Sequence, residues 1–393
     1  MSPDINTPAM PLAGLTHATL FGNARLVLAD RVVLGWLAVA GEWIVGLGEG
    51  DAGAAAQDLG GDFLLPGLVE LHTDHLESHL QPRPQVRWDT LGAVLAYDAQ
   101  IAASGITTVF DSLRVGTDAD GGGLGGEAMA LLGTLDQAQR QGLLRANHLT
   151  HLRCELPAPD VVTATTALLG QYPVGLISLM DHTRGQRQFR DIEQFYAYAA
   201  RHGANRAEVE AAARRKLSQA EAFGDGHRAA LVALAKAHGV VLASHDDTTP
   251  ADVAESARDG VALAEFPTTL EAAQACRQAG ITVMMGAPNL IRGGSHSGNI
   301  AAAELAAQGL LEVLSSDYVP ASLLLAAFRL PGLGVGVTLP QAVAMVSRNP
   351  ALATGLLDRG ELAAGRRADL VRVAMAGDQP VVRQVWRGGQ RVS

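Results

Sequence analysis

The sequence predicts an α/β protein: a distorted (β/α)8 barrel of the TIM type, with a small β-sandwich domain formed from both chain ends. Three observations lead to this prediction. Short apolar runs alternate with Ala-rich amphipathic stretches through the middle of the chain, β-rich segments stand near both ends, and metal-ligand residue types follow most of the apolar runs. We expect residues 18–64 and 357–393 to form the β-domain, and residues 65–356 to form the barrel.

The two chain ends share one pattern. Residues 24–50 and residues 368–392 each consist of β-branched and apolar runs that are separated by turn residues. Neither segment is large enough to bury a convincing core by itself. We therefore expect the two segments to pair into one small β-domain.

The middle of the chain supplies eight candidate strands, which is the number that a closed barrel of this type requires. These strands are residues 64–71, 106–111, 147–155, 174–181, 240–244, 261–265, 281–285 and 312–316. Candidate helices fit between them, at residues 92–104, 125–141, 190–202, 205–222, 227–238, 251–259, 269–279 and 298–309. The glycine-rich residues 120–126 and the segment 289–299 are expected to be loops at the top of the barrel.

Composition excludes several classes of protein. The net charge of −10 argues against a nucleic-acid-binding surface, although it leaves room for a locally basic pocket for an anionic small molecule. No apolar run reaches the ~18 residues that span a membrane, and the first residues lack the pattern of a signal peptide. Because Cys154 and Cys276 are the only cysteines, we expect no disulfide framework and a cytoplasmic location.

Metal-ligand residue types gather where barrel enzymes carry their chemistry, at the C-terminal ends of the strands. His72 and Asp74 end the first strand and share a face, because residues two apart in a strand point the same way. Each such residue has an ordinary structural alternative, a core histidine or an aspartate that caps a helix. Their joint placement nevertheless predicts a divalent-metal site. The predicted ligands are His72, Asp74, Glu155, His182, His245 and Asp317.

Specific motifs then carry a resemblance. The segment PGLVELHTD and the two-ended β-domain resemble the amidohydrolase superfamily, as does a C-terminal pattern of Asn349-Pro350-Ala351, Gly360, Gly365, Ala368-Asp369-Leu370-Val371, Val385-Trp386 and Gly388. Seven segments resemble one family within it, the diphosphatases of the carbon–phosphorus lyase pathway. They are residues 64–74, 151–157, 178–189, 243–249, 264–269, 285–299 and 314–324.

This resemblance implies hydrolysis of α-D-ribose 1-methylphosphonate 5-triphosphate to the 5-phosphate and pyrophosphate, with one or two divalent ions. Zinc is the first choice, and manganese or iron also suits these ligands. Asp317 would accept the proton of the attacking water. Many relatives bridge two metals with a strand lysine, but Lys216 and Lys236 both fall in expected helices. Glu155 is then the best candidate for the bridging anion.

A triphosphate calls for forked cationic donors and for backbone N–H groups. The candidates for these roles are Arg153, Arg184, Arg187, Arg292, Gly293, Gly294, Ser295 and His296. Glu265 could bind metal or substrate, or form an ion pair with an arginine of the upper loops. His75 stands where the family pattern has Asn, and it is either an alternate ligand or a polar residue of the rim.

Two other functions stay open on the sequence alone. The same metals could serve an amide, cyclic amide or N-acetyl hydrolase, which would need fewer converging cationic donors. A non-enzymatic scaffold would be expected to lose metal ligands, whereas this chain retains a candidate at every position. The expected partner is a small phosphonate sugar triphosphate, and a homodimer and an association with enzymes of the carbon–phosphorus lyase pathway are further expectations.

Overall fold

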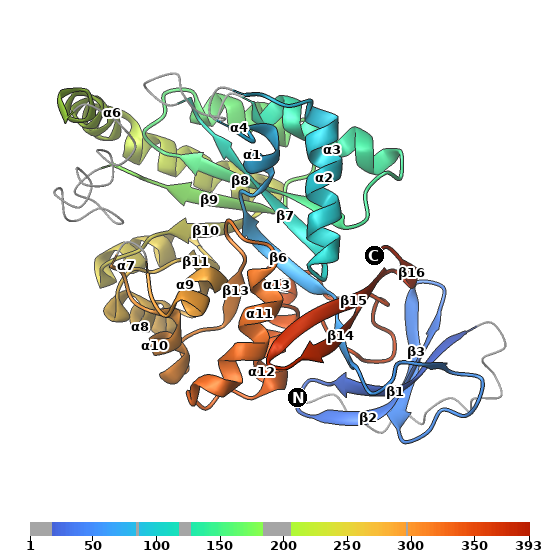
Figure 1. Cartoon of the computed structure of the whole chain (residues 1–393). Coiled ribbons are helices and arrows are strands. Elements are labelled where there is room, and N and C mark those ends of the chain that lie inside the picture. The colour runs from blue at the N-terminus through green and yellow to red at the C-terminus, as the bar shows by residue number, and fades with distance from the viewer. Residues whose placement is uncertain (1–17, 84–85, 118–126, 184–205, 296–297) are drawn as a thin grey trace.

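The computed structural model describes residues 18–83, 86–117, 127–183, 206–295 and 298–393. Its strands form two separate sheets, one built from the middle of the chain and one from both ends (Figure 1). The predicted fold class is confirmed. The predicted helix 190–202 and the glycine-rich residues 120–126 lie outside the described residues.

Eight parallel strands in sequential order form the barrel sheet. They are β6 (Leu68–Thr73), β7 (Ile106–Val115), β8 (Asn147–Glu155), β9 (Leu176–Met180), β10 (Val241–His245), β11 (Leu263–Glu265), β12 (Thr282–Gly286) and β13 (Val313–Ser315). Most of their residues are buried, as parallel strands covered by helices require. Sequential order brings every strand's C-terminal end to the same side of the molecule.

The first strand of the barrel is joined to the segments around the last strand by backbone hydrogen bonds and by one buried carboxyl group. We call the C-terminal ends of the strands the upper end of the barrel and the opposite side the lower end. Towards the lower end, the backbone N–H groups of Val69 and Leu314 donate to the carbonyls of Val346 and Met345, at 2.9 Å each. At the upper end the buried Glu70 accepts from the backbone N–H of His72 at 2.7 Å and of Ser316 at 2.6 Å. Burial raises the pKa of Glu70 to about 8. The Glu70 carboxyl group and the backbone hydrogen bond from Asp317 to the His72 carbonyl together hold β6 against the segment after β13.

Helices cover the barrel. They are α1 (Leu76–Leu80), α2 (Thr90–Ala103), α3 (Ala128–Arg140), α4 (Val161–Leu169), α6 (Arg206–His238), α7 (Pro250–Asp259), α8 (Leu270–Ala279), α9 (Ala287–Arg292), α10 (Ala302–Ala307), α11 (Ser322–Arg329), η3 (Leu330–Leu333), α12 (Leu339–Ala344) and α13 (Arg348–Ala353). None of the described helices is long and apolar enough to cross a membrane.

The helix α6 corrects the prediction of two helices at residues 205–222 and 227–238. It is one continuous helix of 33 residues. Gly224 and Gly226 lie between the two predicted helices, and each glycine costs about 1 kcal/mol in a helix interior. Buried contacts further along, through Leu231 and Ala235, supply the packing that local preference lacks.

The turns after β10 and β11 are built alike. Thr249 and Thr269 each cap a helix by accepting from a backbone N–H three residues later, and Gly260 and Gly280 end those helices in the left-handed conformation. Caps of this kind contribute about 1 kcal/mol each. These rigid turns hold the ends of β10 and β11, where His245 and Glu265 stand.

The small domain combines β1 (Thr19–Val27), β2 (Val32–Ala40), β3 (Trp43–Glu49), β4 (Gln57–Asp58) and β5 (Phe63–Pro66) with β14 (Leu370–Ala376), β15 (Gln379–Arg387) and β16 (Gln390–Arg391). Phe21 and Trp386 meet edge to face at 4.9 Å in its core. The strand β5 pairs with β1 and β14. Residues 65 and 66, which the sequence prediction assigns to the barrel, therefore pair in the small sheet.

Candidate metal centre and active site

Three residues at the upper end of the barrel adopt an unusual backbone conformation. Asp246, Phe266 and Asp317 have φ angles of 57°, 57° and 53°. Asp246 and Phe266 directly follow β10 and β11, and Asp317 comes two residues after the end of β13. A non-glycine residue in this region costs on the order of 1–3 kcal/mol and persists where surrounding structure enforces it. The three positions mark one site on the barrel.

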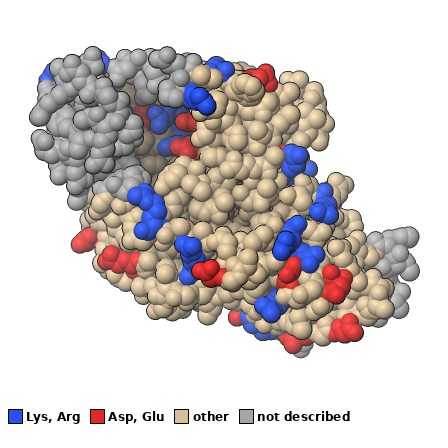
Figure 2. Space-filling view, viewed as in Figure 1, with Lys and Arg blue, Asp and Glu red and all other residues tan. Residues whose placement is uncertain are grey.

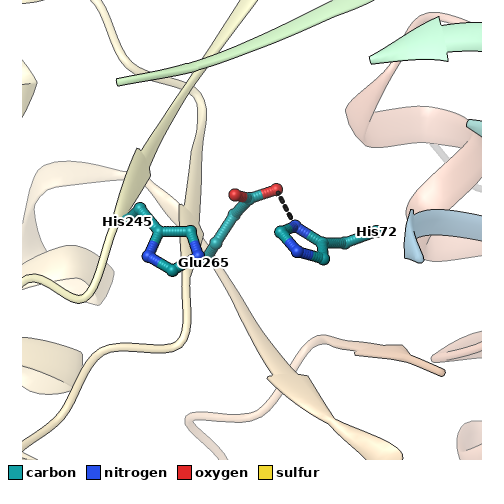
Figure 3. Close-up of side chains that lie close together, drawn as sticks. All are labelled: His72, His245 and Glu265. Atoms are coloured by element: carbon teal, nitrogen blue, oxygen red, sulfur yellow. Dashed lines mark ion pairs between the residues drawn. The ribbon is translucent and has the colours of Figure 1, made fainter. Parts of the chain in front are cut away.

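Below them, three buried side chains from three strands converge. His72 comes from β6, His245 from β10 and Glu265 from β11 (Figure 3). One ligand atom from each lies within 4.8 Å of the others. The Nδ1 of His72 is 3.1 Å from Oε1 of Glu265, and neither side chain is more than 1% exposed. We call these three residues the buried triad.

The chemistry of the triad fits a divalent cation. His72 Nδ1 and Glu265 Oε1 are buried, and neither has a hydrogen-bond partner among the described residues despite their short separation. Burial, followed by the charges of Arg153 and His245, lowers the pKa of His72 well below its usual range, so the imidazole is neutral. Two imidazoles and a carboxylate are ligands that Zn, Mn and Fe accept. A cation between them would satisfy both unpaired atoms.

The second oxygen of Glu265 is held from below. Ser178 donates to Glu265 Oε2 at 2.7 Å. His151 makes a short hydrogen bond to the Ser178 hydroxyl and contacts the Ser112 hydroxyl at 2.9 Å through its other ring nitrogen. Burial lowers the pKa of His151 to about 3, so its ring is neutral and serves as a hydrogen-bonding spacer. This chain orients Glu265 toward His72.

A second group of potential ligands shares His245 with the triad. It consists of His182, His245 and Asp246. Asp246 lies 2.9 Å from His245 Nδ1, and it outweighs the effect of burial and raises the pKa of His245. Glu155, the predicted bridging anion, contacts Nδ1 of His182 at 2.6 Å and its backbone N–H at 3.1 Å. Lys216 and Lys236 both lie in α6, so neither stands on a barrel strand.

Asp317 stands at the top of the triad. Its backbone N–H donates to the carbonyl of His72 at 3.1 Å, and its own carbonyl accepts from Thr73 Oγ1 at 2.7 Å. Burial, and then the charge of Asp74, raise the pKa of Asp317 to about 7. A carboxyl group with this pKa can take up and release a proton near neutral pH.

Asp74 and Arg153 lie together beside the triad. The strand β6 ends at Thr73, and Asp74 turns to accept from Arg153 at 3.3 Å. Asp74 is accordingly not among the groups of ligand atoms that meet within 4.8 Å in the described residues. The alternation of a strand placed Asp74 on the face of His72, but that rule ends where the strand does. Arg153 is buried and carries its charge into the site.

The predicted phosphate-binding loop is only partly described. Arg292 is the exposed last residue of α9, and Gly293 follows it in the left-handed conformation. Gly294 and Ser295 are half-buried. Arg184, Arg187 and His296 lie outside the described residues. Figure 2 shows a hollow next to the undescribed residues in which both basic and acidic side chains are visible.

Sequence reasoning left out three residues that the structure brings into the site. Ser178 carries no signal of its own, because a serine within a strand is usually packing. His151 shares a strand face with Glu155, which was the available signal. Asp246 directly follows His245, and its place at the strand end was the available signal. Its backbone is left-handed, with a φ angle of 57°.

Comparisons with known proteins identify relatives of the chain. A model of the amidohydrolase family matches residues 99–393. The chain is 45% identical over 376 residues to the α-D-ribose 1-methylphosphonate 5-triphosphate diphosphatase of Escherichia coli strain K12, which covers 95% of this chain and all of that protein.

Solved structures share the fold at much lower identity. N-acetyl-D-glucosamine-6-phosphate deacetylase from Mycobacterium smegmatis matches with a TM-score of 0.64 and 19% identity, covering 95% of this chain and 99% of that one. The 5-methylcytosine deaminase from Klebsiella pneumoniae also has a TM-score of 0.64, with 16% identity and coverage of 95% and 98%.

Proposed function

The chain belongs to the amidohydrolase family, and we propose that it hydrolyses α-D-ribose 1-methylphosphonate 5-triphosphate to the 5-phosphate and pyrophosphate. The observation that carries the proposal is the 45% identity to the Escherichia coli diphosphatase along that protein's whole length. The buried triad gives the proposal a chemical basis, because it offers ligands for a divalent ion beside a carboxyl group that can exchange a proton.

We assign the metal to His72, His245 and Glu265, with His182, Asp246 and Glu155 as the ligands of a second ion. Zinc suits these side chains best, and manganese or iron would also bind. When bound, such an ion lowers the pKa of a coordinated water and polarises a phosphoryl oxygen. The protein's part is to hold its ligands rigidly, and the hydrogen-bonded chain through Ser178 and His151 does this for Glu265.

Asp317 accepts the proton of the attacking water in this proposal. Its raised pKa makes it an effective base near neutral pH, since the proton can be passed on after each turnover. The hydrogen bonds of its backbone to His72 and Thr73 hold it against the end of β6, the strand that carries His72. Asp74 is assigned to positioning Arg153, which it contacts at 3.3 Å.

The cationic groups of the site bind the polyphosphate. Arg153 is buried beside Asp74, and its charge would face the phosphoryl group under attack. Arg292 and the loop 293–296 would hold the departing pyrophosphate with forked and backbone donors. We assign Arg184 and Arg187 the same role on their sequence pattern.

Phosphorus NMR of the metal-reconstituted protein with the triphosphate in ¹⁸O-enriched water tests this function. Stoichiometric pyrophosphate supports it, and ¹⁸O in the 5-phosphate or in the pyrophosphate identifies the phosphorus that the water attacks. No turnover by the metal-loaded protein would contradict the proposal. An amide or N-acetyl substrate would then be tested next, and a chain that binds less than one ion would fit a scaffold.

Three further assignments accompany the function. We propose a cytoplasmic location, which agrees with two buried free cysteines. Homodimer formation and association with carbon–phosphorus lyase pathway enzymes stay predictions. Size-exclusion chromatography with light scattering checks the first, and co-purification from cells grown on a phosphonate checks the second.

A further inference from the structure

Two histidines on the rim of the barrel converge on one oxygen. His75 and His79 are four residues apart, so their rings project from the same side of α1. The Nε2 atoms of both rings lie 3.1 Å from the same atom, Oε1 of Gln100 in α2. The ring centroids are 5.2 Å apart. None of the three residues belongs to the buried triad or to the second ligand group.

These distances match those between ligands of one metal ion. Zinc binds imidazole nitrogen at about 2.0–2.1 Å and oxygen at similar distances, so two ligands of a tetrahedral site lie roughly 3.3 Å apart. Each Nε2 is already 3.1 Å from the Gln100 oxygen. Two of the three separations among these ligand atoms are therefore already close to those around a single ion.

We propose that His75, His79 and Gln100 form an accessory site for a divalent cation that prefers imidazole ligands, of the class of Zn²⁺, Ni²⁺ and Cu²⁺. The site is separate from the buried triad and independent of the proposed reaction. Gln100 is exposed and the two histidines are half-buried, so an ion can reach the site directly from solvent and keep water as its remaining ligands.

The protonation of the rim agrees with this assignment. A metal ligand must be a neutral imidazole. Burial lowers the pKa of His79, the hydrogen bond to Gln100 opposes the shift, and the charge of His75 adds to it. Little proton release is therefore needed at His79 near neutral pH.

The structure also limits the strength of the site. A metal-bound histidine usually donates its other ring N–H to an acceptor, and loss of such a partner costs about 10–100-fold in affinity. His75 Nδ1 is buried and has no hydrogen-bond partner within the described ranges. The rim site is therefore expected to fill at higher free Zn²⁺ than the buried triad, and Mg²⁺, which prefers oxygen ligands, should not compete for it.

Equilibrium dialysis of the full-length protein against buffered Zn²⁺ tests the proposal, with bound metal counted by atomic emission. We expect the wild-type protein to bind one more ion per chain than His79→Asn, and excess Mg²⁺ to leave that ion in place. The matched control is His238→Asn, which removes an exposed histidine of α6 and should bind as many ions as the wild type.

A gain-of-affinity variant guards against loss of folding. Gln100→Glu replaces a neutral oxygen by a charged one, and it should lower the free Zn²⁺ that half-fills the rim site severalfold. Equal stoichiometry of the wild type and His79→Asn would overturn the proposal. An unchanged midpoint in Gln100→Glu would do the same, as would an equal loss of the ion in His238→Asn.

Discussion

Two buried clusters of histidine and carboxylate lie in this molecule, and they are completed in different ways. The buried triad joins His72, His245 and Glu265. The second cluster, here called the His148 cluster, places His148 between Asp98 at 3.2 Å and Asp111 at 2.9 Å. Both contain only imidazoles and carboxylates, and both are nearly inaccessible to water.

The charged groups of the His148 cluster find their ion-pair and hydrogen-bond partners within the protein. Burial disfavours the imidazolium, but Asp111 and Asp98 outweigh it and raise the pKa of His148 to about 9. Asp98 also accepts from the backbone N–H groups of Arg145 and Ala146, at 2.9 Å each. Tyr97 donates to Asp111 at 2.9 Å. Every charge has its partner within the chain.

The buried triad leaves polar atoms without hydrogen-bond partners in the described part of the chain. His72 is neutral, and the facing atoms of His72 and Glu265 have no hydrogen-bond partners among the described residues. Buried polar atoms without partners are costly and rare, so a fold retains them where a ligand completes them. The comparison teaches that residue composition does not separate a structural cluster from a functional one. The two are separated by whether every buried polar atom has a partner within the protein.

The largest expected effect concerns Asp317. Asp317→Asn keeps the shape of the site but removes the base, and we expect kcat to fall by about 10²–10⁴-fold while bound metal stays at the wild-type level. Steady-state kinetics with metal analysis of the same samples measures both. Near-normal turnover in this variant would remove Asp317 from the mechanism.

The next-largest effect is expected in the His148 cluster, which needs no metal ion. His148→Asn leaves Asp98 and Asp111 buried without their cation, which should cost about 3–5 kcal/mol in the free energy of unfolding. Urea denaturation measures the loss, and His238→Asn is the control at an exposed position. The affinity of the folded variant for Zn²⁺ should not change, and a lost ion would mean that the two clusters are coupled.

The same cluster predicts a pH dependence. The pKa of His148 is about 9 in the folded chain and 6.5 for an unperturbed histidine, so its contribution to stability is fully present below pH 6.5 and is lost as pH rises through 9. The difference corresponds to about 3 kcal/mol. The dependence of stability on pH is measured from the midpoint of urea denaturation across that pH range, for the chelator-treated wild type and for His148→Asn. Parallel curves for the two proteins would contradict the assignment.

A smaller effect tests the support below the triad. Ser178→Ala removes the donor to Glu265 Oε2, and the affinity for Zn²⁺ should fall by about 10–100-fold. Ser256→Ala is matched to it, because Ser256 is also buried and donates to a carboxylate, Asp247, outside the triad. If both variants bound Zn²⁺ equally well, Ser178 would have no part in positioning Glu265.

The sequence predicts the barrel well for a physical reason. Alternation of apolar runs with amphipathic helices reflects burial, and burial decides which segments become strands. The prediction from this alternation fails at α6, where Gly224 and Gly226 indicate a break that tertiary packing overrides. It also assigns residues 65 and 66 to the barrel, because an apolar strand looks the same in either sheet.

The candidate site is predicted in part. Position at a strand end brings His72 and His245 together, since the ends of parallel strands meet on one side of a barrel. Glu265 stayed ambiguous, because its partners come from β6 and β9, and sequence does not show which side chains meet across a barrel. His148 and His151 lie three residues apart on β8, so alternation places them on opposite faces, but only their contacts show that one is ion-paired and the other lies below the triad.

The most direct test of the central claim is the response of thermal unfolding to Zn²⁺ in the chelator-treated wild type and in two variants, Glu265→Gln and His148→Asn. We predict that Zn²⁺ at about 100 times its dissociation constant stabilises the wild type and His148→Asn by roughly 2.7 kcal/mol each, and that this stabilisation is lost in Glu265→Gln. Equal stabilisation of Glu265→Gln would show that the cation binds elsewhere and would contradict the assignment of the buried triad.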